Sequence, residues 1–247
     1  MNRNFQEIYN KSIENPEEFW KNNSEDIFWF KKPTKILNKS NHPFYKWYED
    51  GVTNTCYNAL DVHIDKGNGD KTALIYDSPI TGNKSKHTYK ELKEKVSKFA
   101  GALVNQGVSK GDRVIIYMPM IPEAVIAMLA CSRIGAIHSV VFGGFASNEL
   151  ASRIDDSKAK ILITASCGFE PSRTVEYKPL VDGAMKLATH KVEKIIFFQR
   201  KGNEVKLNPP IEISWDEALS NSKDVDCVEM NSNCLLYTSP SPRDNRW

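Results

Sequence analysis

Two short segments combine residue types and spacings that could bind a ligand. The tetrapeptide FGGF (142–145) directly follows an apolar run, and the segment SCGFEPSRT (166–174) directly follows another. Paired glycines let a backbone approach a ligand closely and adopt positive φ, although a tight turn alone explains such a pair more often. The pair does not fit the GxGxxG spacing of dinucleotide-binding proteins.

The second segment contains an arginine that could bind a phosphate through two parallel N–H donors. From spacing alone, Arg173 is equally compatible with a solvated surface position or with an ion pair to Glu170 or Glu176. Both interpretations stay open at this stage.

The other chemically capable side chains suit structural roles. His138 lies inside an apolar run, as a packed core histidine would, and Asp155 and Asp156 stand at the end of a predicted helix, where water can solvate them. The five cysteines include neither a CxxC pair nor a Cys/His zinc spacing, so the sequence predicts no metal site. Cys131 lies in AVIAMLACSRIGA, where a free thiol packs as a small hydrophobe.

The elements that would position the two segments alternate along the chain. Thr88 and Glu91 form a capping-box pattern before a helical stripe that ends near Gly107, and Pro122 suits the first position of a second helix that reaches Gly135. Ser147 is a candidate cap for a third helix, whose apolar face carries Leu150 and Ile154, and Val181, Ala184, Met185 and Ala188 mark a fourth. Apolar runs predict strands at 72–76, 113–118, 136–142, 159–165 and 194–198.

This alternation predicts an α/β fold: a layered, doubly wound, mostly parallel sheet with short connections. The runs at 113–118, 136–142 and 159–165 are mainly apolar, which predicts strands buried on both faces. Residues 1–62 differ, because they are rich in aromatics without clear periodicity. We expect these rings to anchor an irregular segment onto a larger body, since no basic groove accompanies them for stacking on nucleobases.

Composition excludes several classes of partner. The 247 residues are 40% hydrophobic and 26% charged with a net charge of +2, which gives no electrostatic case for nucleic acid or an acidic membrane. No apolar run reaches the ~18 residues of a membrane span. The odd cysteine count and the acid-rich first twenty residues predict a reducing, cytoplasmic location, with the mitochondrial matrix possible if the N-terminus is incomplete.

Two long blocks carry a family resemblance. NTCYNALDVHIDKGNGDKTALIYDSPITG (54–82) and GDRVIIYMPMIPEAVIAMLACSRIGAIHSVVFGGFASNEL (111–150) closely resemble AMP-forming acyl-CoA synthetases of the acetyl/propionyl type, in the adenylate-forming family. The likeness runs from about residue 16 to 236. Residues 165–184 look more like propionyl-CoA synthetases, because acetyl-CoA synthetases usually carry a second arginine where this chain has Glu170. The resemblance implies the N-terminal part of a β-α layered body that is normally followed by a mobile lid.

The resemblance also implies a reaction and a ligand. A short carboxylate attacks the α-phosphorus of Mg-ATP to give an acyl-adenylate and pyrophosphate, and the CoA thiol then displaces AMP. In this family Phe142, Gly143 and Gly144 would flank the pantetheine arm of CoA. The segment Glu170, Pro171, Ser172 and Arg173 matches the loop that touches the CoA nucleotide, with Arg173 as the partner of its 3′-phosphate. ATP, Mg²⁺ and CoA are thus the implied ligands of the parent enzyme.

The chain departs from the family at the phosphate loop. LLYTS (235–239) matches its start, but Pro240 follows where Gly-Thr-Thr-Gly is expected. A phosphate loop directs backbone N–H groups at the anion, and proline has no N–H. Only Thr238 and Ser239 remain of that loop, so we expect residues 63–239 to be a partial AMP-binding domain and 240–247 to be a non-native tail.

The resulting prediction is a catalytically incomplete piece of a propionate or acetate–CoA ligase. It holds no complete catalytic set of its own, and no cofactor is expected to bind it productively. Its partners would be small molecules, namely the carboxylate, CoA and ATP, without nucleic acid or membrane. The alternative prediction is a non-catalytic CoA-binding α/β module.

Overall fold

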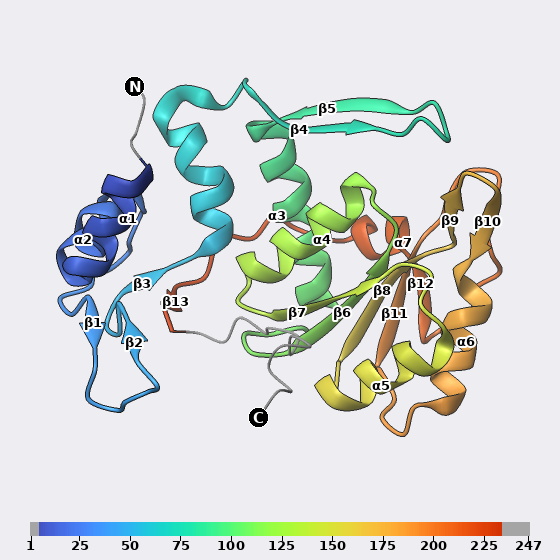
Figure 1. The fold of residues 1–247 in the computed structure, drawn as a ribbon. Coiled ribbons are helices and arrows are strands. Elements are labelled where there is room, and N and C mark those ends of the chain that lie inside the picture. The colour runs from blue at the N-terminus through green and yellow to red at the C-terminus, as the bar shows by residue number, and fades with distance from the viewer. Residues whose placement is uncertain (1–4, 234–247) are drawn as a thin grey trace.

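The computed structural model describes residues 5–233, and its centre is a parallel sheet with helices on both faces (Figure 1). The five strands lie in the order β12-β11-β8-β6-β7, and every neighbouring pair is parallel. The predicted doubly wound α/β fold is therefore confirmed. The strands are β6 (Arg113–Met118), β7 (Ile137–Phe142), β8 (Ile161–Ala165), β11 (Lys194–Phe198) and β12 (Glu212–Ser214).

Two helical layers cover the sheet. One layer contains α3 (Tyr89–Asn105), α4 (Pro122–Arg133) and α7 (Trp215–Ser220), and the other contains α5 (Ser147–Ser157) and α6 (Tyr177–Leu187) (Figure 1). The central strands β6 and β8 are buried on both faces, as their mainly apolar runs predict. In the first layer the ring of Phe99 stacks on Trp215 with centroids 3.6 Å apart.

Local signals set the helix boundaries as expected. Thr88 and Glu91 form the capping box of α3, and Gly107 adopts φ +84° just beyond its end. Pro122 is the first residue of α4, and Gly135, with φ +71°, follows it. Cys131 is fully buried in α4, and this burial raises the pKa of its thiol to about 12.

The strand predicted at 72–76 is confirmed as β4 (Thr72–Asp77), but it pairs antiparallel with β5 (Lys84–Thr88) in a separate hairpin and is not part of the parallel sheet. Two other expectations for individual elements are wrong. The strand β7 is the edge of the central sheet, so Val140 and Phe142 are exposed rather than buried. Ser147 does not cap α5, because its hydroxyl donates to the Leu180 carbonyl of α6.

The N-terminal segment is more regular than predicted. It begins with the helices α1 (Phe5–Glu14) and α2 (Pro16–Asn23), and residues 55–68 are helical, with π-helical turns at Tyr57–Asp61 and Ile64–Asn68. Its aromatics mostly contact one another and many stay partly exposed, so burial on the larger body is not their main role. Short strands β1 (Leu37–Asn38), β2 (Lys46–Trp47) and β3 (Val52–Thr53) complete it.

Residues 222–231, which we call the strap, join the end of the described chain to its beginning. They cross α3, where Ser97 exchanges hydrogen bonds with the Val225 backbone and Gly101 leaves room for the Lys223 carbonyl. The strap ends in β13 (Met230–Asn231), which pairs antiparallel with β3. In the described part of the chain, no helix is both long and apolar enough to cross a membrane.

Candidate functional site

The strand order defines where a ligand should bind. Numbered along the chain, the central strands lie in the spatial order 2-1-3-4-5, so the order reverses between β6 and β8. In open α/β sheets, ligands bind at such a switch point, beyond the carboxyl ends of the strands. The structure has a cleft of about 370 Å³ there, between the ends of β6 and β7, the turn after β4 and the strand β9 (Cys167–Glu170).

The FGGF turn forms one wall of this cleft. Phe142 is 71% exposed and, with Gly143, lines the cleft, whereas Gly144 does not. The turn is held from below by Tyr117, whose hydroxyl donates to the Phe145 carbonyl at 2.7 Å and accepts the Gly144 N–H at 3.2 Å. Burial raises the pKa of Tyr117, so this hydroxyl stays protonated and able to donate.

Each glycine of the turn has its own structural reason. A Cβ on Gly143 would overlap the hydroxyl of Tyr177 and lie 2.8 Å from the Met118 carbonyl oxygen. Gly144 adopts φ +96°, which favours glycine. The tight-turn interpretation therefore accounts for both residues, and at this wall the cleft is lined by the backbone of Gly143 and by the exposed Phe142.

The segment 166–174 is a β-hairpin and not a loop. Strand β9 pairs antiparallel with β10 (Arg173–Glu176), and Pro171 and Ser172 form the exposed two-residue turn. Arg173 Nε lies 2.8 Å from Glu170 Oε2, and the two side chains are 70% and 45% exposed. The hydrogen bond to Glu170 raises the pKa of Arg173. The ion-pair alternative therefore describes the structure as it stands, with Glu170 rather than Glu176 as the partner.

Of the sequence-predicted residues, three line the cleft together: Phe142, Gly143 and Glu170. Arg173, Pro171 and Ser172 do not line the cleft and lie on the tip of the hairpin. Thr238 and Ser239, predicted as the remnant of a phosphate loop, lie outside the described residues.

Sequence reasoning missed one cation at the cleft. Arg200 follows β11, is buried to 9% exposure, lines the cleft and places its guanidinium 4.6 Å from the centre of the Phe169 ring. Its backbone N–H donates to the Ser166 hydroxyl at 2.8 Å. The sequence contains a signal for this residue. Arg200 follows the apolar run KIIFF, so it lies at the same carboxyl edge of the parallel sheet as the FGGF turn.

The other candidates have structural roles. His138 is half-buried on β7, and burial lowers its pKa. Asp155 does more than face water: its carboxylate accepts hydrogen bonds from the backbone N–H groups of Thr189 and His190 and from the Thr189 hydroxyl. These bonds lower the pKa of Asp155 to about 2.

Fold and cleft together define a doubly wound α/β protein with a cleft at the switch point of its sheet, the place where this class of fold binds ligands. Comparison with protein families makes this more specific. A family model described as "AMP-binding enzyme" matches residues 62–241, and one described as "Acetyl-coenzyme A synthetase N-terminus" matches residues 5–59. The chain belongs to the AMP-binding enzyme family.

Known relatives agree with the predicted resemblance. The chain is 52% identical over 232 residues to the human protein "Acyl-CoA synthetase short-chain family member 3, mitochondrial", covering 92% of this chain and 34% of the relative. It is 42% identical over 248 residues to the acetyl-coenzyme A synthetase of Xylella fastidiosa, covering 96% of this chain and 38% of that protein. The chain thus spans about a third of the length of the curated relatives that it matches.

A solved structure supports the fold. The acetoacetyl-CoA synthetase from Streptomyces lividans superposes with a TM-score of 0.81 at 21% sequence identity, covering 92% of this chain and 34% of the other. At this identity the likeness concerns the fold. The predicted resemblance to AMP-forming acyl-CoA synthetases is confirmed by the family models and the relatives together.

Proposed function

We propose that the full-length protein ligates a short-chain carboxylate, propionate or acetate, to CoA through an acyl-adenylate, with ATP and Mg²⁺. The supporting observation is the meeting of the FGGF turn and the Glu170–Arg173 hairpin at one switch-point cleft, in a chain of the AMP-binding enzyme family. The names of the relatives, acyl-CoA and acetyl-CoA synthetases, support the class of reaction.

In this proposal the described residues form the CoA side of the site. The pantetheine arm is slender and largely apolar between its amides, so it suits a wall made of backbone and the exposed Phe142 ring. The nucleotide end carries a 3′-phosphate, which needs a cation. Arg173 is the exposed cation on the hairpin tip, and its planar guanidinium matches a phosphate.

Glu170 competes with a bound phosphate for Arg173, because the two side chains already form an ion pair. Arg173 must exchange its carboxylate partner for the phosphate, and because both side chains are largely exposed to water, their ion pair is weak. A dianionic phosphate can therefore displace Glu170, but it meets a neighbouring negative charge. We infer that Glu170 reduces the contribution of Arg173 to CoA binding without abolishing it.

Calorimetric titration of CoA and of dephospho-CoA, which lacks the 3′-phosphate, tests this assignment. Arg173→Ala should weaken CoA binding about tenfold while leaving dephospho-CoA binding unchanged. Lys186→Ala removes one exposed cation from α6 and serves as the matched control, with no effect on either ligand. Equal CoA affinities for Arg173→Ala and the unsubstituted chain would refute the role of Arg173.

ATP chemistry is a separate question for the chain as printed. Because Pro240 stands where the family's phosphate loop has its first glycine, we expect no ATP–pyrophosphate exchange with propionate or acetate. CoA binding without exchange would favour the alternative function, a non-catalytic CoA-binding module. Exchange above background would contradict the expected inactivity.

We also propose the organisation and location of the protein. Residues 1–62 would form an N-terminal segment of the acetyl-CoA synthetase type, 63–239 a partial AMP-binding domain and 240–247 a non-native tail. A transcript that encodes Gly-Thr-Thr-Gly after Ser239 would establish that tail as foreign. We propose a cytoplasmic or mitochondrial-matrix location, as the name of the human relative includes "mitochondrial". Imaging of the tagged full-length protein tests this.

A further inference from the structure

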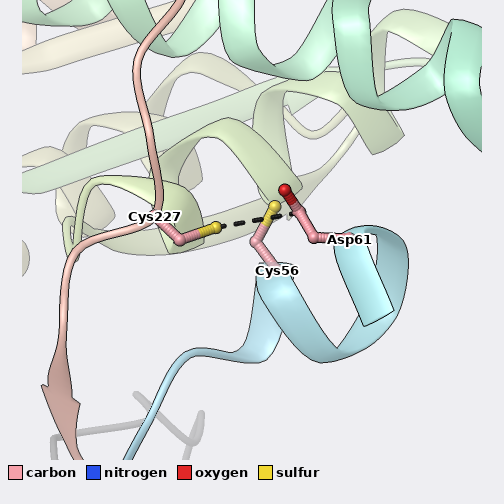
Figure 2. Close-up of side chains that lie close together, drawn as sticks. All are labelled: Cys56, Asp61 and Cys227. Atoms are coloured by element: carbon pink, nitrogen blue, oxygen red, sulfur yellow. Dashed lines mark hydrogen bonds between the residues drawn. The ribbon is translucent and has the colours of Figure 1, made fainter. Parts of the chain in front are cut away.

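A second group of reactive side chains lies away from the cleft, where the N-terminal segment meets the strap. Cys56 and Asp61 come from the helical segment 55–68, and Cys227 comes from the strap (Figure 2). Their two sulfur atoms and a carboxylate oxygen lie within 4.8 Å of one another. Residues about 170 positions apart in sequence thus meet through reactive atoms.

Arg133, at the end of α4, is the centre of this group. Its side chain is only 1% exposed, and its Nη1 and Nη2 donate to the two Asp61 oxygens at 2.9 and 3.2 Å. The same Nη1 lies 3.1 Å from Cys227 Sγ and 3.7 Å from Cys56 Sγ. Both sulfur atoms therefore face a buried, permanently charged guanidinium.

This setting differs from that of an ordinary buried thiol. The hydrogen bond from the Cys227 thiol lowers the pKa of Cys56, and the nearby Arg133 lowers it further despite burial. The same hydrogen bond raises the pKa of Cys227. Cys131, buried without a charged partner at its sulfur, has its pKa raised to about 12 and remains a thiol. The pair therefore places a sulfur with a lowered pKa next to a second thiol that donates to it, an arrangement that favours thiol exchange.

A metal ion would use the same three ligands, since two thiolates and a carboxylate suit Zn²⁺. The guanidinium argues against it. Arg133 already supplies the positive charge that these groups need and donates to all three of them, so a divalent cation would have to lie against a fixed positive charge. The arrangement fits thiol chemistry better than metal binding.

We propose that Cys56 and Cys227 form a reversible disulfide, a modification site that covalently ties the strap to the N-terminal segment. Cys227 is the partly exposed member and Cys56 the fully buried one, so the exchange begins at Cys227.

With glutathione disulfide as oxidant the reaction balances. Cys56, once ionised, takes the proton of the Cys227 thiol to which it is hydrogen-bonded, and the Cys227 sulfur attacks one sulfur of glutathione disulfide, which breaks that S–S bond and releases one glutathione thiolate. This thiolate takes the proton back from Cys56, whose sulfur then attacks Cys227 Sγ in the mixed disulfide, and the second glutathione leaves. Two protein thiols are oxidised, glutathione disulfide is reduced to two glutathiones, and the protons pass to the leaving thiolates.

Peptide mass spectrometry of the whole chain tests the site. The chain is equilibrated with glutathione disulfide, alkylated, digested without reduction and analysed for a peptide pair joining positions 56 and 227. We expect this pair in the unsubstituted chain and in the control Cys167→Ser, and its loss in Cys56→Ser and in Cys227→Ser. Dithiothreitol should restore both free thiols.

Three outcomes would overturn the proposal. Glutathione attached to Cys227 at saturating oxidant, without a peptide pair joining positions 56 and 227, would show that the two sulfur atoms cannot form a disulfide. Alkylation of both thiols regardless of oxidant would show that the cluster is only packing. Stoichiometric Zn²⁺ binding to the reduced chain that protects Cys56 and Cys227 from alkylation, and is lost in Cys227→Ser, would replace the disulfide by a metal site.

Discussion

Two arginine–carboxylate pairs in this molecule have nearly the same contact distance and opposite surroundings. Arg133 and Asp61 meet at 2.9 Å with side chains 1% and 12% exposed, whereas Arg173 and Glu170 meet at 2.8 Å with side chains 70% and 45% exposed. The first pair joins three parts of the chain, and the second closes one hairpin. Distance alone therefore says little about what an ion pair does.

Solvation explains the difference. Burial by itself would lower the pKa of Arg133, but the hydrogen bond to Asp61 and the neighbouring groups raise it, so the buried cation depends on its partners. Water solvates Arg173 and Glu170 whether or not they touch. The buried pair therefore has a structural role. In the exposed pair, Arg173 can exchange Glu170 for another anion.

The largest effect should come from removing one member of the buried pair. Asp61→Ala leaves the Arg133 guanidinium without its carboxylate, and we expect a loss of about 3–5 kcal/mol in the free energy of unfolding, measured by urea denaturation. Glu170→Ala, the matched change in the exposed pair, should cost less than about 1 kcal/mol. Similar losses in the two variants would remove the distinction between the pairs.

A double substitution sharpens the same comparison. Replacing both buried partners by apolar residues, Asp61→Leu with Arg133→Met, removes the uncompensated charge. Its unfolding free energy should lie closer to that of the unsubstituted chain than that of Asp61→Ala does. A double variant less stable than Asp61→Ala would mean that Arg133 stabilises the chain mainly through its contacts with Val225 and Cys227 of the strap, and not through charge compensation with Asp61.

The next effect concerns the wall of the cleft. Gly143→Ala forces a methyl group against Tyr177 and the Met118 carbonyl, and we expect a cost of about 1–3 kcal/mol in the same assay. In a Tyr177→Phe background the loss of stability should be smaller, because this substitution removes the overlapped hydroxyl. Gly69→Ala is the control, because its Cβ would meet no atom closer than 3.6 Å. An unchanged stability for Gly143→Ala would mean that the turn adapts.

A smaller effect should follow from neutralising the exposed carboxylate. Glu170→Gln removes the charge that competes with a phosphate, so CoA affinity should rise about threefold, while stability changes by less than about 0.5 kcal/mol. Titration with CoA and dephospho-CoA measures the affinities, and urea denaturation measures the stability. A gain of equal size for dephospho-CoA would assign the effect to general charge and not to the 3′-phosphate.

The smallest effect concerns acid sensitivity. The pKa of Asp155 is depressed to about 2 by hydrogen bonds from His190 and Thr189, so its stabilising contribution is complete above the unfolded value near 4 and is lost as the pH falls toward 2. Asp155→Asn removes the charged carboxylate, so it should lower stability at neutral pH and flatten the decline in stability over that interval. Parallel acid-unfolding curves for the two chains would contradict this linkage.

The sequence predicted the elements whose signals are local. The capping box of Thr88 and Glu91, Pro122 at a helix start and the buried runs of β6 and β8 each follow from neighbouring residues. Edge position is not a local signal, because the place of β7 at the edge of the sheet follows from the strand order and not from its own residues. β12 was missed because its three residues give too short a pattern.

The candidate site was predicted in part for the same reason. The FGGF turn and the hairpin arginine follow apolar runs, so the parallel sheet places them at one edge. The Glu170–Arg173 pair was one of several open alternatives, since spacing does not show which carboxylate an arginine meets. The buried group around Arg133 gave no sequence signal, because its members come from distant segments.

The strap also has a consequence for the order of events during synthesis. Asn54 donates to the Val228 carbonyl, and β3 pairs with β13, so these contacts of the N-terminal segment form only after residues about 170 positions later have been synthesised. At roughly 5–20 residues per second, this delay is on the order of ten to thirty seconds. The strands of the central sheet all precede the strap in sequence, so the contacts between the N-terminal segment and the strap close after the central sheet has been synthesised.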